Sequence, residues 1–187
     1  MSDFRPDILA LFEVTSSFLE AIREMTQAYP FRHELPADDN YGMAIYSRYK
    51  IDDWIILEDN DIPVAVKFSL PSQNLQLYFV HLPPPIFSDL WKIQSRTLKK
   101  IASMVNKERR RTIVAGDFNL TPWSGLLLDF IQESQLKHYR PDKVYLPATW
   151  PSPFPLLPLD HTFSSTPVEV QYGPTLESDH NSLEIKI

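Results

Sequence analysis

Acidic, amide and imidazole side chains follow two apolar runs of the chain. Asp117 and Asn119 come directly after the apolar run 112–115, and His81 ends the run 75–80. If the strand predicted at 112–115 continues through Asp117 and Asn119, their side chains point to the same side, since alternate strand residues share a face. Oxygen ligands that converge at strand ends suit Mg²⁺ or Mn²⁺. These residues therefore predict a site for a hard cation at one end of a sheet.

Four more groups of this kind belong to other apolar runs. Glu13 interrupts the run 8–14, Asp160 begins the run 160–163, and Asp179 and His180 precede the run 182–187. Taken one at a time, each has an ordinary alternative as a strand-edge carboxylate, a turn residue or a surface pair, because Asp and Asn also favour turns. Four predicted strands nevertheless each place a carboxylate or imidazole at one terminus. That repetition, rather than any one residue, indicates a functional site.

Length and composition narrow the class of protein. The chain has 187 residues, 43% hydrophobic and 22% charged, which is typical of one globular domain. It has no cysteine, which excludes disulfides, thiolate metal sites and cysteine nucleophiles. A net charge of −6 excludes a strongly basic, sequence-blind nucleic-acid coat. No apolar run reaches the ~18 residues of a membrane span, and no apolar h-region follows the first residues, so a cytoplasmic protein is the default expectation.

Strand-like runs outnumber helical ones. Helices are predicted at 17–27, where Ser17 begins a capping-box pattern, at 88–105, and after Ser124. Strands are predicted at 8–14, 43–46, 54–57, 64–68, 75–80, 112–115, 160–163, 168–170 and 182–187. Many strands with few, widely separated helices indicate an α/β fold in which two sheets pack face to face with helices outside.

Several short motifs now resemble those of the endonuclease/exonuclease/phosphatase superfamily, and they occur in the order found in that family. The segment 6–14 resembles the one that bears the family's metal-binding Glu, and His81 before a triple proline resembles its strand-ending His. The other matches are Gly116-Asp117-Phe118-Asn119, Leu159-Asp160-His161 and Ser178-Asp179-His180, while Thr121-Pro122-Trp123-Ser124 and Thr149-Trp150-Pro151 resemble a bacterial subgroup.

The resemblance implies one domain over residues 1–187, folded as a four-layer α/β sandwich of two packed, mainly antiparallel sheets flanked by helices. It also implies a Mg²⁺- or Mn²⁺-dependent phosphoric ester hydrolase that acts on a phosphodiester or phosphomonoester. Glu13 and Asp179 are the residues that it implies for the metal.

The remaining matched residues receive catalytic roles from the resemblance. Asp117 is expected to deprotonate the attacking water, and Asn119 to hydrogen-bond that water or a phosphoryl oxygen. His180 is expected to contact the phosphate while Asp160 fixes its tautomer, and His81 is a second donor to the phosphoryl group.

One feature departs from the family pattern. The family opens with a strand that carries an Asn metal ligand about two dozen residues before the Glu, whereas here Asn40 is the first asparagine. We therefore expect that strand and its ligand to be absent, with weak metal binding as a consequence. A catalytically weak or inactive family member that acts as a binding module is the alternative function. The neighbours of the absent strand would expose unpaired backbone groups, through which a homodimer can form.

The sequence leaves the substrate open between a nucleic acid and a phospholipid head group. The charge of −6 argues against long duplex DNA. The aromatic residues Trp123, Trp150 and Phe154 can stack on a base or contact a lipid chain. They can equally pack within a stiff, proline-rich surface loop at 147–158, which is the favoured interpretation. The remaining histidines, His33, His138 and His161, are expected to be structural or exposed, with His161 directed away from the site.

Overall fold

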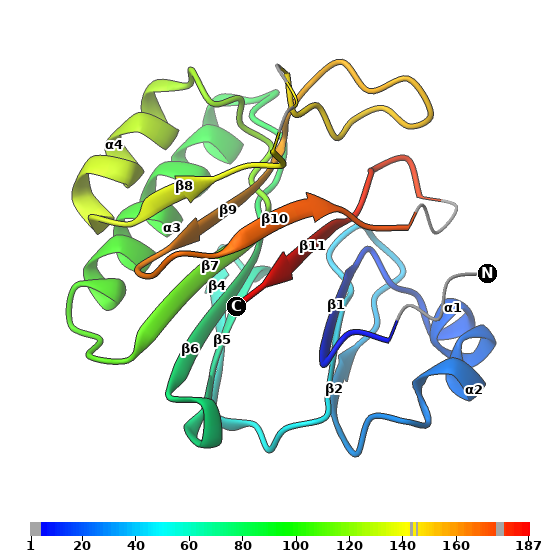
Figure 1. The fold of residues 1–187 in the computed structure, drawn as a ribbon. Coiled ribbons are helices and arrows are strands. Elements are labelled where there is room, and N and C mark those ends of the chain that lie inside the picture. Colours follow the sequence, from blue (N-terminus) through cyan, green and yellow to red (C-terminus); the bar gives the residue numbers. More distant parts are fainter. Residues whose placement is uncertain (1–4, 143, 145, 175–177) are drawn as a thin grey trace.

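The structure is a computed structural model that describes residues 5–142, 144, 146–174 and 178–187 (Figure 1). The helices are α1 (Ser16–Ala21), α2 (Arg23–Thr26), α3 (Ser88–Val105) and α4 (Gly125–Ser134), with a 3₁₀ turn at Pro71–Gln73. The strands are β1 (Ile8–Phe12), β2 (Phe31–Leu35), β3 (Met43–Ser47), β4 (Asp52–Asp59), β5 (Ile62–Leu70), β6 (Leu75–His81), β7 (Arg111–Asp117), β8 (Lys137–Tyr139), β9 (Asp160–Ser164), β10 (Glu169–Tyr172) and β11 (Leu183–Lys186).

The largest sheet has six strands in the order β4-β5-β6-β7-β9-β8. Its neighbours are antiparallel except β6 and β7, which are parallel and are joined through α3. A parallel pair needs such a crossover, because a tight turn cannot return the chain to the same end of the sheet. As a result the carboxyl ends of β6 and β7 lie side by side.

One face of this sheet packs on α3 and α4. The apolar residues of α3 recur every three or four positions, as in Leu98, Ile101 and Val105, and they are buried against alternate residues of the sheet. In β6 these are Tyr78 and Val80. Side chains at the helical spacing of α3 and at alternate positions of β6 therefore pack in one core cluster.

Two smaller sheets cover the opposite face. One has the order β1-β3-β2, and the other pairs β10 with β11. Even-numbered residues of β1 such as Ala10 and Phe12, together with Ile185 of β11, pack on the cluster that holds Phe68 and Leu77 of the large sheet. Both smaller sheets thus share one layer.

The short helices α1 and α2 form the outer layer on the three-stranded sheet. Leu19 of α1 packs with Tyr46 of β3 and with the odd-numbered residues Leu9 and Leu11 of β1. The predicted four-layer α/β sandwich is therefore confirmed. The start of α1 differs from the prediction, because Thr15 rather than Ser17 caps it by accepting a hydrogen bond from Phe18 N at 3.2 Å.

The two smaller sheets of the second layer are not hydrogen-bonded to each other in the described part of the chain. In the described part of the chain β1 pairs only with β3, and β11 pairs only with β10, so both strands have a free edge. Figure 1 shows β1, in blue, and β11, in red, as neighbouring strands with no strand between them. An unpaired edge presents a row of N–H and C=O groups to solvent or to another chain.

The strands β2 and β8 were not predicted from the sequence. Both have little apolar content: β2 reads Phe-Arg-His-Glu-Leu and β8 reads Lys-His-Tyr. Each lies at the edge of its sheet, where one row of hydrogen bonds to a neighbour is enough to order it. Across the described residues, no helix is both long and apolar enough to span a membrane.

Candidate active site

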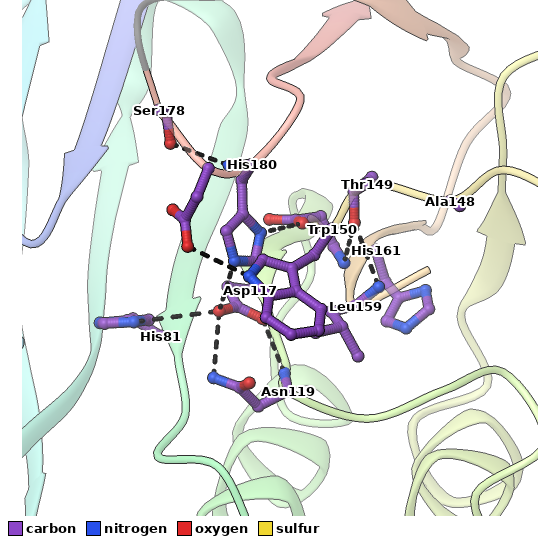
Figure 2. A network of polar contacts seen from close by, with 12 residues as sticks. His81, Asp117, Asn119, Ala148, Thr149, Trp150, Leu159, His161, Ser178 and His180 are labelled. Carbon is purple, nitrogen blue, oxygen red and sulfur yellow. Dashed lines mark hydrogen bonds and ion pairs between the residues drawn. The ribbon is translucent and has the colours of Figure 1, made fainter. Parts of the chain in front are cut away.

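Three neighbouring strands bring polar side chains to one register at the same end of the large sheet. His81 is the last residue of β6 and lies opposite Asp117, the last residue of β7. Asp117 in turn lies opposite Asp160, the first residue of β9. Because β6 and β7 are parallel and β9 runs against them, two strand ends and one strand start coincide here. Figure 2 shows the polar network that results.

The turn after β7 depends on two unusual backbone conformations. Gly116 has φ 134°, and a Cβ at this position would lie 2.1 Å from Val80 O of the neighbouring strand. Asn119 has φ 49°, in the left-handed region that Asn tolerates better than most residues. The strand therefore ends at Asp117, so the condition that it continues through Asn119 is not met. Instead, the chain folds back onto the Asp117 carboxylate.

Asn119 holds that carboxylate with two hydrogen bonds. Its backbone N–H donates to Asp117 Oδ1 at 2.7 Å, and its Nδ2 donates to Asp117 Oδ2 at 3.0 Å. The same Nδ2 also donates to Leu82 O at 2.8 Å. Both amide hydrogens of Asn119 are thus used within the protein. These contacts fit an orienting role for Asn119 better than direct contact with a phosphoryl oxygen.

Asp117 is a buried carboxylate with a shifted proton affinity. Burial raises its pKa to about 7, and the charge of Asp160 adds to the rise. The charges of His180 and His81 and the N–H of Asn119 act in the opposite direction but do not cancel it. A carboxyl group with a pKa close to neutral is well suited to exchange a proton with water.

Asp160 and His180 form the shortest ion pair of the network. His180 Nδ1 donates to Asp160 Oδ2 at 2.7 Å, the hydrogen bond expected from the sequence. Burial alone would lower the pKa of His180, but the hydrogen bond to Asp160 and the charges of Asp160, Asp117 and Asp179 raise it to about 9. His180 is therefore a cation at neutral pH, with its Nε2 at 4.0 Å from Asp117 Oδ2.

His81 connects Asp117 to Glu13. Its Nε2 lies 3.9 Å from Asp117 Oδ2 and 3.5 Å from Glu13 Oε1. Two carboxylates around Nε2 favour the tautomer with a proton on that nitrogen. Among the described residues, Nδ1 of His81 is buried without a hydrogen-bond partner. The ring packs beside Phe12 at a centroid distance of 5.3 Å, which holds it at the strand end.

Glu13 reaches this network because the strand pattern is interrupted after β1. The residue has φ 56°, and Leu11 and Val14 on either side of it both pack in the outer cluster under α1. One extra residue in a strand reverses the alternation of faces, as in a β-bulge. The Glu13 side chain is about half exposed, with 51% of its area accessible.

Asp179 is held by the proline-rich loop. Trp150 Nε1 donates to Asp179 Oδ2 at 3.1 Å, and Ser152 N donates to Asp179 O at 2.7 Å. Thr149 Oγ1 accepts from the backbone N of Leu159 and of Asp160, which ties the same loop to β9. The loop therefore positions both Asp160 and Asp179. Spacing along the chain did not reveal these links, because 10 to 29 residues separate the partners.

Two of the three aromatic side chains considered in the sequence are exposed rather than packed within the loop. Trp123 is 62% exposed and Phe154 is 81% exposed. Trp150 is the exception, since it bonds Asp179. The interpretation that all three pack the proline-rich loop is therefore wrong for Trp123 and Phe154.

His161 faces away from the network, as expected. It follows Asp160 in β9, so its side chain points to the other face of the sheet, where it is buried. Its Nε2 bonds Leu120 O at 2.7 Å and its Nδ1 bonds His138 Nε2 at 3.2 Å. Since a carbonyl only accepts, Nε2 carries the proton and His138 is the donor to Nδ1. His33 stacks on Trp54 in another part of the molecule.

The acidic groups fit a hard divalent cation. One ligand atom each from Asp117, Asp160 and His180 lie within 4.8 Å of one another. His180 is a poor ligand, however, because its Nδ1 is bonded to Asp160 and its ring is protonated. Glu13 keeps an exposed carboxylate next to the network, and carboxylate oxygens are what Mg²⁺ prefers. The donor set is thus compatible with Mg²⁺, while the assignment of Glu13 and Asp179 as its ligands stays a prediction.

The sequence matches the model of the Endonuclease/Exonuclease/phosphatase family over residues 1–180. The chain belongs to this family. Its members are hydrolases that act on phosphoesters with the help of divalent metal ions. None of the curated proteins matches the chain in sequence.

Solved structures of related fold support the assignment. A 3′-5′ exonuclease from Neisseria meningitidis is 16% identical with a TM-score of 0.75, covering 99% of this chain and 90% of its own. A 3′ phosphatase from Neisseria bound to a product DNA hairpin is 17% identical with a TM-score of 0.68, covering 97% and 89%. The beta toxin of Staphylococcus aureus with bound magnesium ions is 15% identical with a TM-score of 0.68, covering 97% and 87%. At these identities the likeness shows the fold of this family member.

Proposed function

We propose that this protein is a Mg²⁺-dependent phosphoesterase that hydrolyses a phosphodiester or a phosphomonoester. The observation that carries the proposal is the network Glu13–His81–Asp117–His180–Asp160, which five separate segments of the chain bring to one sheet end. It combines a carboxylate whose pKa is near 7 with a cationic imidazole, so a proton acceptor and an anion-binding group lie side by side.

Glu13 and Asp179 are the residues that would hold the metal. When bound there, Mg²⁺ or Mn²⁺ supplies positive charge that offsets the phosphate charge and stabilises the leaving oxygen. With two carboxylates as its protein ligands, the cation would keep several waters and bind weakly.

Asp117 and His180 then divide the remaining work. The Asp117 carboxylate accepts a proton from the attacking water, for which a pKa of about 7 is suitable. His180 donates its Nε2 hydrogen to a phosphoryl oxygen while Asp160 holds the ring by Nδ1. His81 offers a second Nε2 hydrogen beside Asp117.

Asn119 acts as a positioning residue in this scheme. Its two bonds to Asp117 fix the plane of the carboxylate, and its bond to Leu82 O anchors it to the loop after β6. A freely rotating carboxylate would present the wrong oxygen to water for much of the time. We therefore expect its loss to act through Asp117.

The test is hydrolysis of bis-p-nitrophenyl phosphate and of p-nitrophenyl phosphate with and without Mg²⁺. We expect Mg²⁺-dependent turnover by the wild type and none by Asp117→Ala. The matched control is Asp129→Ala, which removes an exposed carboxylate of α4 and should retain activity. If neither ester is hydrolysed at any Mg²⁺ concentration, the alternative of an inactive binding module replaces the proposal.

Metal affinity is tested by isothermal titration with MgCl₂. We expect weak binding by the wild type and a further loss in Glu13→Gln. Tight binding that Glu13→Gln does not change would show that other residues hold the cation. The three groups Asp117, Asp160 and His180 would then be the first to examine.

We further propose that two copies of the protein associate through the free edge of β1. Arg48 N donates to Asp7 O at 2.9 Å, which makes residues 7, 9 and 11 the ones whose backbone groups face β3. The N–H of Ala10 therefore points to the open side. Ala10→Pro removes this donor without touching the β3 ladder, and edge strands tolerate proline.

Sedimentation equilibrium decides this point. We expect a dimer for the wild type and for Ala10→Ser, and a monomer for Ala10→Pro. A monomeric wild type would remove the proposal of a homodimer.

A further inference from the structure

Three loops around the site carry no charged residue. They are 82–87 (Leu-Pro-Pro-Pro-Ile-Phe), 120–124 (Leu-Thr-Pro-Trp-Ser) and 147–158 (Pro-Ala-Thr-Trp-Pro-Ser-Pro-Phe-Pro-Leu-Leu-Pro). Charged residues make up 22% of the whole chain, so surface loops without any are unusual for it. The same loops hold nine of the 17 prolines. They are therefore both uncharged and stiff.

Large apolar side chains stand exposed on all three loops. The most exposed are Phe154 at 81%, Ile86 at 69%, Phe87 and Leu156 at 68%, and Trp123 at 62%. A single exposed apolar side chain on a protein surface needs no explanation. Five of them on three uncharged loops that adjoin one site do need an explanation.

All three loops adjoin the strand termini that form the site. The first begins directly after His81, the second directly after Asn119, and the third is tied to Asp179 through Trp150. Since a chain extends at most ~3.6 Å per residue, Phe87 lies within about 22 Å of His81 and Trp123 within about 15 Å of Asn119. Figure 1 shows the third loop, in yellow and orange, projecting beyond the sheets.

We propose that these loops dock the protein on the surface of a neutral, zwitterionic lipid bilayer. The exposed side chains would enter the headgroup region and place the site over a phosphoester headgroup. For the identity of that substrate the inference rests on the proposed function, whereas the docking itself does not. Exposed aromatic and aliphatic side chains on a stiff support lose little entropy when they are buried in the interface.

A single-stranded nucleic acid is the other partner that exposed aromatic side chains can bind. Such a partner needs cationic side chains along the phosphate backbone as well as stacking surfaces. The three loops contain neither Lys nor Arg, and the whole chain has a net charge of −6. The charge pattern therefore favours the zwitterionic surface.

The experiment measures co-sedimentation of the protein with phosphatidylcholine vesicles. We expect the wild type to partition onto them, and the partition coefficient to fall about tenfold or more in Phe154→Ser and in Trp123→Ser, as burial of a large apolar side chain predicts. Met25→Ser is the matched control. Met25 is 73% exposed in α2, in a different layer of the molecule, and its loss should leave partition unchanged.

Two readouts separate the docking from the chemistry. Asp117→Ala should bind vesicles like the wild type, and Phe154→Ser should hydrolyse bis-p-nitrophenyl phosphate like the wild type. Hydrolysis without vesicle binding would overturn the docking and leave the proposed function standing. Vesicle binding without hydrolysis would overturn the proposed function and leave the docking standing.

Two further results would overturn the proposal. One is partition that Met25→Ser weakens as much as Phe154→Ser does, since binding would then not involve the loops. The other is binding of a dT20 oligonucleotide, measured by fluorescence anisotropy, that Trp123→Ser abolishes while vesicles are not bound. That result would assign the loops to single-stranded nucleic acid.

Discussion

Asp160 and His161 are neighbours in β9, yet they belong to two regions with opposite electrostatics. On one face, Asp160 pairs with His180 beside Asp117, and this histidine has its pKa raised to about 9. On the other face, His161 pairs with His138, whose pKa burial lowers to about 3. The pKa of His161 is lowered as well, mainly by burial.

This comparison shows that the neighbouring groups, more than burial, set the charge of His180 and His138. Burial by itself acts to lower the pKa of both His180 and His138. Three carboxylates surround His180 and overcome that effect, whereas the neighbours of His138 are His161, Arg140 and aromatic rings. A charged site and a neutral core pair therefore lie on opposite faces of a single strand.

Asp117→Asn should give the largest effect, a loss of activity without any loss of stability. We expect kcat to fall about 10³-fold, because the proton acceptor is lost. In metal-free buffer at pH 8 the unfolding free energy should rise, since a carboxylate whose pKa is raised to about 7 destabilises the fold when it ionises. Steady-state kinetics and urea titration check the two halves. A variant that is both inactive and less stable would contradict this separation of roles.

His161→Ala should show the converse behaviour on the other face of β9. The change opens a cavity beside Phe118 and Phe163 and leaves Leu120 O without its donor. We expect a loss of about 3 kcal/mol in unfolding free energy. The folded fraction should keep its kcat within about threefold. A large loss of kcat at full folding would show that the core pair also serves the chemistry.

Asp160→Asn sharpens the comparison because it removes charge but keeps the shape. His180 would lose the carboxylate that keeps it cationic, so we expect kcat to fall about 30-fold, within the range for residues that orient a functional group. Asp142→Asn is a control outside the network. The variant is measured by kinetics at pH 7.5 with circular dichroism to show that folding is kept. Unchanged kcat would remove Asp160 from the mechanism.

The smallest expected effect is the pH dependence of stability from the core pair. The pKa of His138 is about 3 when folded and near 6.5 when unfolded, so below pH 6.5 the unfolded chain binds more protons. Stability is therefore lost as the pH falls, by about 1.5 kcal/mol between pH 6.5 and 5. Urea titrations across this range measure the slope. His138→Gln, which can still donate to His161, should flatten it, and an unchanged slope would assign the loss to other groups.

Much of the site could be predicted because its residues follow strand ends. His81, Asp117 and Asp160 end or begin runs whose apolar pattern is clear, and their register in β6, β7 and β9 brings them together. The opposite orientation of Asp160 and His161 follows from the period of two in a strand. The role of Asn119 was harder to predict, since its left-handed backbone turns it back onto Asp117.

The sequence by itself determined the α/β class, most of the strands, the long helix α3 and the identity of the polar groups, because periodicity and local motifs are encoded over a few residues. Only the tertiary structure decided how Trp150 holds Asp179 and that His138 pairs with His161. Each of these joins segments that are distant in the chain. Such contacts depend on how whole layers pack, and no local pattern of residues encodes that packing.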